Sequence, residues 1–231
     1  MSGNIQSDAT VTWQAATNLG TDPRPSLRTL SGLASITTYE LMMMCMMTTT
    51  GRCSEGHAWA AGDNGALFVL TGTGTWGPVG AFTPRPGAGS SYLGMAVDPY
   101  NTDVSVVGSS GTYVQRVSGS ANSWTMPQPS PIGTSTLRSA CAFSSYDRWA
   151  VGDGGVVYRT GYDILGITWE KDTIQLVDKN YATVDFKGVH CSPASNGKPQ
   201  RVSVVGSKGT FIFRNYDSGM GQYMPWQVAA E

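Results

Sequence analysis

The sequence has few charged residues and few of the residue types that build catalytic or metal sites. Charged side chains make up 13% of its 231 residues and the formal net charge is −1, whereas about a quarter of an average globular protein is charged. It contains two histidines, four cysteines and no C-x-x-C pair. The composition argues against nucleic acid as a partner, because no basic patch is present to neutralise phosphates. It also predicts no metal site.

Long apolar runs are absent as well. No segment approaches the roughly 18 apolar residues of a membrane helix, and residues 1–8 have neither the basic nor the apolar region of a secretory signal. We therefore expect no membrane insertion and a cytoplasmic or virion-associated protein. Cys141 and Cys191 lie in apolar, strand-like runs, as does Cys45, whereas Cys53 does not. A thiol in such a run behaves as a small hydrophobe, so we expect free, buried cysteines.

What the sequence does contain is a repeat. Similar segments begin near residues 58, 104, 148 and 202, roughly 45 to 55 residues apart, which is close to the length of a four-stranded propeller blade. Each copy has two glycines three positions apart between runs rich in β-formers: Gly62 and Gly65, Gly108 and Gly111, Gly152 and Gly155, Gly206 and Gly209. An X-Gly pair between two such runs is typical of a tight hairpin that needs positive φ.

Each hairpin has recognisable neighbours. A tryptophan follows each hairpin on a predicted outer strand: Trp76, Trp124, Trp169 and Trp226. A predicted inner strand precedes each: residues 41–47, 93–97, 137–143 and 186–191. The pattern predicts an all-β fold, a small β-propeller with about four four-stranded blades, or five if the N-terminal segment holds a degenerate copy.

Residues 1–40 lack the hairpin and are predicted to form an N-terminal arm, with the propeller in residues 41–231. The arm carries Trp13 on what we predict to be an orphan outer strand. Residues 26–34 resemble residues 136–143, so a degenerate blade and a long insertion in the first blade both remain open. The strand of Trp13 is a candidate for pairing with the blade edge of a neighbouring subunit.

The third copy carries a family resemblance. Residues 148–160, followed by Gly-Ile-Thr-Trp at 166–169, resemble a blade of the photosystem II assembly and stability factor family, and more broadly the Asp-box blades of neuraminidase-type propellers. The types found in the family's loop occur here at Thr160, Asp163, Gly166, Thr168 and Trp169. The likeness covers about residues 58–231 and implies the fold rather than a function. The chain differs from that family in having no arginine cluster.

The polar residues of the repeat have a structural explanation. Asp63 and Asp153 occupy equivalent turn positions, where aspartate hydrogen-bonds to turn backbone, so we do not interpret them as a catalytic pair. A sialidase-type site would need an arginine cluster, a nucleophilic tyrosine and an acid. Arg116, Arg159 and Arg214 end corresponding strands and are expected to lie far apart on different blades. We predict no enzyme activity, no catalytic residue and no cofactor.

These observations lead to two functional hypotheses. The first is a non-enzymatic interaction or structural module within a larger assembly, such as a virion or phage surface component or an accessory subunit of a complex. Its partners would be proteins, and a second copy of the chain is one candidate. The alternative is a glycan-binding propeller lectin, in which exposed aromatic rings stack on sugars. The tryptophans of this repeat are more typical of packing between blades.

Overall fold

In the computed structural model, residues 2–5, 11–14, 27–32, 58–70, 76–79, 89–98, 103–116, 124–163, 166–176, 181–195 and 197–229 are described. This part of the chain is all-β and antiparallel, which confirms the predicted fold class at that level. Its helical residues form short 3-10 turns: η1 (Ser109–Gly111), η2 (Asp153–Gly155) and η3 (Tyr181–Thr183). No helix in the described ranges is long and apolar enough to cross a membrane.

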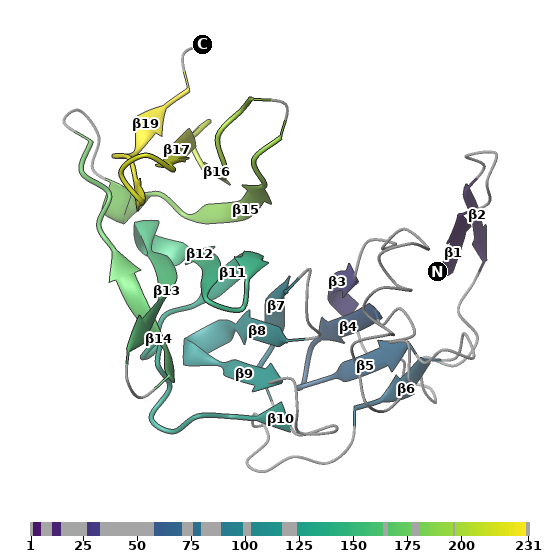
Figure 1. The fold of residues 1–231 in the computed structure, drawn as a ribbon. Helices are drawn as coiled ribbons and strands as arrows, with labels where there is room; N and C mark the ends of the chain where they lie inside the picture. Colours follow the sequence, from purple (N-terminus) through teal and green to yellow (C-terminus); the bar gives the residue numbers. More distant parts are fainter. Residues whose placement is uncertain are drawn as a thin grey trace.

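Four sheets follow one another along the chain (Figure 1). Sheet one contains β3 (Leu27–Gly32), β4 (Ala58–Gly62), β5 (Leu67–Leu70) and β6 (Trp76–Pro78), and sheet two contains β7 (Tyr92–Val97), β8 (Val104–Gly108), β9 (Tyr113–Arg116) and β10 (Trp124–Thr125). Sheet three contains β11 (Leu137–Ser144), β12 (Asp147–Gly152), β13 (Val157–Asp163) and β14 (Gly166–Asp172). Sheet four contains β15 (Phe186–Ser192), β16 (Arg201–Gly206), β17 (Phe211–Asp217), β18 (Gln222–Tyr223) and β19 (Gln227–Val228).

The sheets form an open arc. In each, the strands lie side by side in chain order, except that β18 and β19 of sheet four both pair with β17. The first strands contact one another in sequence, β3 with β7, β7 with β11 and β11 with β15. Sheet one and sheet four lie at opposite ends of the arc (Figure 1). Among the four sheets that the structure describes in this arc, sheets two and three each have two neighbours, and sheets one and four each have one.

The first strand of sheet one differs from the prediction. The strand that pairs with β4 is β3 (Leu27–Gly32), with Leu27 opposite Gly62, whereas we had assigned this role to residues 41–47. Those residues lie outside the described ranges. The pairing places part of the predicted arm in sheet one, with a long insertion before β4, which is the second of the two alternatives. Similarity between residues 26–34 and 136–143 was the signal for it.

Trp13 does not lie on an orphan strand. It belongs to β2 (Val11–Gln14), which pairs with β1 (Ser2–Ile5) in a separate hairpin, with Trp13 opposite Gly3. A lone strand offers two unpaired edges, whereas β1 already occupies one edge of β2. Pairing of β2 with a neighbouring subunit is therefore less strongly supported than the sequence suggested.

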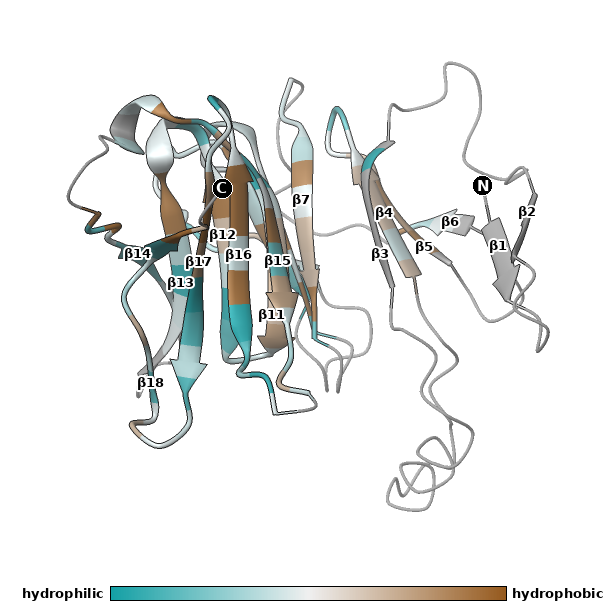
Figure 2. Ribbon diagram, turned by 90° about the horizontal axis from the view of Figure 1, so that it is seen from above, coloured by the Kyte–Doolittle hydropathy of each residue, from teal (hydrophilic) through white to brown (hydrophobic). Residues whose placement is uncertain are grey.

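Three of the four repeat tryptophans lie on the outer strand of their sheet, as predicted. Trp76, Trp124 and Trp169 belong to β6, β10 and β14. In sheet four β18 and β19 both pair with β17, and Trp226 lies between them rather than on a strand. Trp124, Trp169 and Trp226 are buried in the hydrophobic clusters between sheets. Figure 2 shows hydrophobic residues along the middle of β12 and β16, in sheets three and four.

A disulfide joins sheets three and four. Cys141 on β11 and Cys191 on β15 are bonded, with their Cα atoms 5.7 Å apart. Our expectation of free thiols is wrong for this pair, because the first strands of adjacent sheets bring two cysteines together that are 50 residues apart in the chain. Cys45 and Cys53 lie outside the described residues.

Candidate functional site

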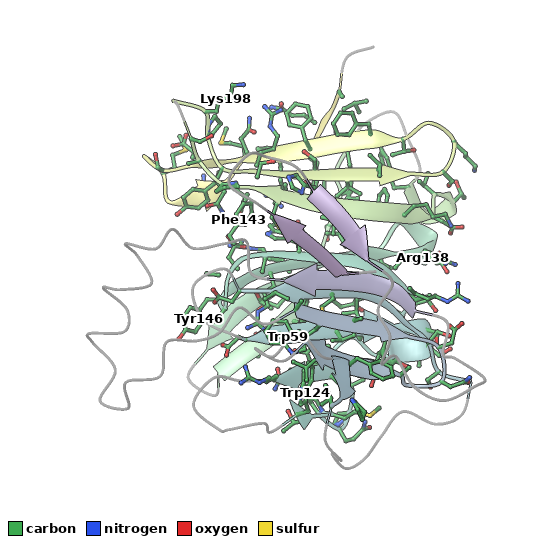
Figure 3. The ribbon with its side chains drawn as sticks, turned by 90° about the vertical axis from the view of Figure 1, so that its right-hand side faces the viewer. Trp59, Trp124, Arg138, Phe143, Tyr146 and Lys198 are labelled. Atoms are coloured by element: carbon green, nitrogen blue, oxygen red, sulfur yellow. A yellow bond between two sulfur atoms is a disulfide. The ribbon has the colours of Figure 1, made fainter. Side chains whose placement is uncertain are left out.

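The repeated glycines build two-residue turns that join the second and third strands at one end of every sheet. Asn64 and Gly65 have φ values of 56° and 69°, as a type I′ turn requires, and the Ala66 amide donates to the Asp63 carbonyl. The equivalent pairs also have positive φ: Ser110 and Gly111, Gly154 and Gly155, Lys208 and Gly209. Figure 3 shows Arg138 at this end of the strands and Tyr146 at the opposite end.

The second glycines of sheets one to three also link each sheet to the next. The amide of Gly65 donates to the Ser90 carbonyl at 3.2 Å, and that of Gly111 donates to the Ser135 carbonyl at 2.9 Å. The Gly155 amide donates to the Val184 carbonyl at 2.6 Å. Every acceptor lies two residues before the first strand of the following sheet. The turn is therefore a repeated device for docking a neighbouring sheet.

The first glycines serve close packing. Gly108 and Gly152 have extended backbones, but a Cβ atom would lie 2.0 Å from the Ser91 carbonyl oxygen and 1.9 Å from that of Thr136, respectively. Opposite each first glycine the inner strand has a register shift of the kind made by a β-bulge. Arg138 is the extra residue of the bulge in β11.

In two sheets the arginine of the bulge forms an ion pair with the aspartate of the turn. Arg28 donates to Asp63 through Nε at 2.7 Å and Nη2 at 2.9 Å, and Arg138 makes the same bidentate contact with Asp153. Hydrogen bonding to Arg28 lowers the pKa of Asp63. Ser109 and Ser207 take the place of these acids in sheets two and four, where their hydroxyls accept from backbone amides. The turn acids thus brace their own sheets.

We call the side of each sheet that points toward the next sheet its front face. Two front-face positions repeat: one at Ala61, Val107, Val151 and Val205, the other at Leu67, Tyr113, Val157 and Phe211. In sheets one to three these side chains are 0–5% exposed. In sheet four Val205 is 49% exposed and Phe211 is 43% exposed. The front face of sheet four is an apolar surface of the kind that the other sheets bury.

Polar and charged side chains surround this surface. Phe213 lies beside Val205 and Phe211 in the register, and the Arg201 guanidinium stacks on its ring at 4.4 Å. Nε of Arg201 donates to Oδ1 of Asn215 at 2.8 Å. His190, on β15, is exposed, whereas His57 lies outside the described part of the chain. An apolar centre with a polar rim is typical of a protein interface.

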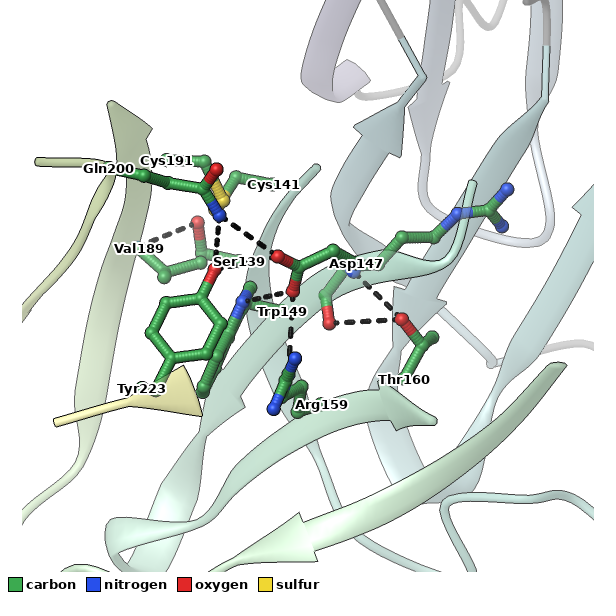
Figure 4. The surroundings of a disulfide bond; sticks show 11 residues. Ser139, Cys141, Asp147, Trp149, Arg159, Thr160, Val189, Cys191, Gln200 and Tyr223 are labelled. Carbon is green, nitrogen blue, oxygen red and sulfur yellow. Dashed lines mark hydrogen bonds and ion pairs between the residues drawn. A yellow bond between two sulfur atoms is a disulfide. The ribbon is translucent and has the colours of Figure 1, made fainter. Parts of the chain in front are cut away.

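A second candidate lies between sheets three and four, near the disulfide (Figure 4). Asp147 accepts hydrogen bonds from Tyr223 Oη at 2.6 Å, Trp149 Nε1 at 2.9 Å and Gln200 Nε2 at 3.0 Å. Arg159 stacks on the Tyr223 ring at 4.5 Å. The contacts that Tyr223 and Gln200 make cross the sheet interface, so the cluster ties sheet four to sheet three.

Our expectation that the repeat arginines lie far apart is wrong for Arg159 and Arg214. Both stack on Trp149, at 5.4 and 5.6 Å, and both line a cavity of about 190 Å³. An adjoining cavity of about 300 Å³ includes Arg214 and Trp226. Arg159 lies four residues after Gly155 and Arg214 lies five residues after Gly209, so Arg159 is on the front face of sheet three and Arg214 is on the rear face of sheet four. These two faces pack against each other, which is why the two arginines share a cavity. Arg116 does not line either one.

The chemistry of this cluster favours structural use. Burial, followed by the hydrogen bond to Asp147, raises the pKa of Tyr223 well above its usual value, whereas a nucleophilic tyrosine needs the opposite shift. Arg214 is held by Asp172 at 2.5 Å and by the carbonyls of Met224 and Tyr223. Trp226 is only 4% exposed, so its ring does not offer a stacking platform.

A third polar cluster is buried between sheets two and three. Arg148 is fully buried, and its guanidinium lies 3.5 Å from Asp103 and donates to Ser105. The Ser145 hydroxyl lies within hydrogen-bond distance of carboxylate oxygens of both Asp98 and Asp103 and can donate its one hydrogen to either. Among the described residues no group of three or more His, Cys, Asp or Glu side chains could hold a metal ion. Because Arg148 is buried against Asp103 and Ser105, this cluster is internal and joins sheet three to sheet two.

Comparisons with known proteins assign no family. No family model matches the chain, and no curated protein matches it. Among solved structures, it is similar to an auxiliary nutrient binding protein from Bacteroides thetaiotaomicron, with 11% sequence identity and a TM-score of 0.49. The match covers 74% of this chain and 38% of that one, so this chain spans well under two thirds of that protein's length.

Proposed function

We propose that this chain is a non-enzymatic, β-propeller-type interaction module that joins a larger assembly through the front face of sheet four. The observation that carries the proposal is the exposure of Val205 and Phe211, whose counterparts in the three preceding sheets are buried. Burial of apolar surface is the main driving force of association. The four sheets are taken here as successive propeller blades, on the strength of the repeat and the open arc.

Absence of activity is part of the proposal. The polar groups that would suggest chemistry are engaged in holding sheets together: Asp63 and Asp153 brace turns, and Asp147 with Tyr223 joins sheet three to sheet four. The Asp-box likeness and the virion setting stay predictions. The lectin alternative loses its main support, because Trp59, Trp124, Trp149, Trp169 and Trp226 are buried.

The native size of the protein tests this function. Tagged wild-type chain and the variants Phe211→Asp and Met220→Asp would be produced in the source cells and sized in gentle extracts. Met220 is the matched control, because it is 66% exposed but lies in the β17–β18 turn. We expect wild type and Met220→Asp in a species much larger than the 24.5 kDa chain, and Phe211→Asp as free chain. Equal sizes for all three would contradict the proposal.

A further inference from the structure

The front faces of the sheets alternate between two types. Sheets one and three carry a tryptophan on the second strand, three residues before the first glycine, Trp59 and Trp149. Sheets two and four carry serine there, Ser105 and Ser203. The serine-type faces continue alike, with Val107 and Tyr113 in sheet two matched by Val205 and Phe211 in sheet four. Sheet two therefore shows what covers a face like that of sheet four.

Sheet three provides the cover for sheet two. Its rear face places Leu137, Ala150 and Trp169 in one buried cluster with Val107 and Tyr113, and Tyr158 packs against the same cluster. The rings of Tyr113 and Trp169 meet edge to face at 5.8 Å. The Gly111 amide completes the contact through the Ser135 carbonyl. The complement of a serine-type face is thus a leucine, an alanine and two aromatic rings, with a free carbonyl before the first strand.

One charge is inverted in sheet four. Asp103 lies five residues before the first glycine of sheet two and faces Arg148 of sheet three. At the equivalent position sheet four has Arg201, which makes no ion pair with any residue that the structure describes. Opposite charges are favoured across an interface and like charges are costly. A sheet that covers sheet four therefore needs an acid where sheet three has Arg148.

On the basis of the function proposed above, we infer that the front face of sheet four binds the rear face of a further blade-type sheet supplied by a different protein. That sheet presents leucine, alanine and aromatic side chains like those of sheet three. It has an aspartate or glutamate facing Arg201, and a backbone carbonyl that accepts from the Gly209 amide. The contact continues the interface that the chain already uses between its own sheets.

A second copy of the chain is a poor match for this description. The sheet that it would offer from the other end of the arc is sheet one, where Ala58 stands at the position of Arg148 and provides no acid. Ala60 and Phe68, on the rear face of sheet one, are already 2% and 8% exposed in the single chain. At Gly209, in contrast, a Cβ atom would meet nothing within 4 Å.

The inference is tested with a probe of defined sequence attached to the full chain. A second copy of residues 127–176, with Cys141→Ala and Arg148→Asp, is joined after Glu231 through a flexible linker. The matched control probe keeps Arg148. We expect the aspartate probe to raise the thermal midpoint and to slow hydrogen exchange at the Gly209 amide on the order of tenfold, the worth of one hydrogen bond. Phe211→Asp in the host chain should abolish both effects.

The contrary results are distinct. If neither probe slows exchange at Gly209, or if the arginine probe performs as well as the aspartate probe, the inferred partner chemistry is wrong. Light scattering of the unmodified chain gives a second test: a dimer that Phe211→Asp separates would make a second copy the occupant and overturn the inference. In these cases a Phe211-dependent native complex would still support the proposed function, which fails only if native size is independent of Phe211.

Discussion

Single glycines allow the first two strands of sheets two and three to approach closely at one end. Gly152 should not tolerate even one methyl group, since its Cβ would lie 1.9 Å from the Thr136 carbonyl oxygen and 2.8 Å from Leu137 Cα. We expect Gly152→Ala to lower the free energy of unfolding by about 1–3 kcal/mol, the usual cost of overpacking. Urea denaturation measures it.

The matched control for this prediction is Gly77→Ala, because a Cβ there would meet nothing within 4 Å. Its effect should stay within about 0.5 kcal/mol, as for most surface substitutions. Equal stability losses at positions 152 and 77 would show that close approach is not the reason for the first glycine of the repeat.

Tyr223 should make the fold sensitive to alkali. Burial and Asp147 raise its pKa above the ordinary value of 10.0, so the folded chain holds the phenolic proton more tightly than the unfolded chain does. Its contribution is therefore complete below about pH 10 and is lost as pH rises beyond that value. We expect the stability of Tyr223→Phe to fall less than that of wild type between roughly pH 9 and pH 11. Parallel curves in denaturation titrations would refute this role.

At the scale of elements, the disulfide should secure sheet four to sheet three. The 50-residue separation of Cys141 and Cys191 predicts that the double variant Cys141→Ser/Cys191→Ser loses about 2–4 kcal/mol. Urea denaturation of both proteins without reductant measures the difference. A variant as stable as wild type would mean that the packing of Phe186, Val202 and Ile212 holds the sheets together unaided.

Most strands could be predicted from the repeat, because paired glycines and alternating β-formers are local signals. The first strand of sheet one was indicated only by the likeness of residues 26–34 to 136–143, and its pairing could not be fixed, since its partner β4 lies beyond a long insertion and strand pairing is not local. For the same reason the sequence did not pair Cys141 with Cys191. That Arg159 and Arg214 lie close together follows from how adjacent sheets pack face to face, and the repeat alone does not specify this packing.

At the scale of the whole molecule, the open arc leaves the front face of sheet four exposed, and the sequence of this sheet does not indicate that exposure. Val205 and Phe211 match their buried counterparts in residue type, so nothing in the repeat distinguishes them as exposed. Only the position of sheet four at the end of the arc does so (Figure 1). The candidate interface is therefore a product of architecture, whereas the turns that frame it could be predicted from their glycines.

Hydroxyl-radical footprinting of the unmodified protein tests this account most directly. In the purified chain Phe211 and Tyr146, both substantially exposed, should be oxidised readily, while the buried Tyr113 should not. In the native assembly we expect Phe211 to become protected to the level of Tyr113, with Tyr146 remaining reactive. Oxidation of Phe211 at the same rate in the chain and in the assembly would contradict the claim that this face is where the protein docks.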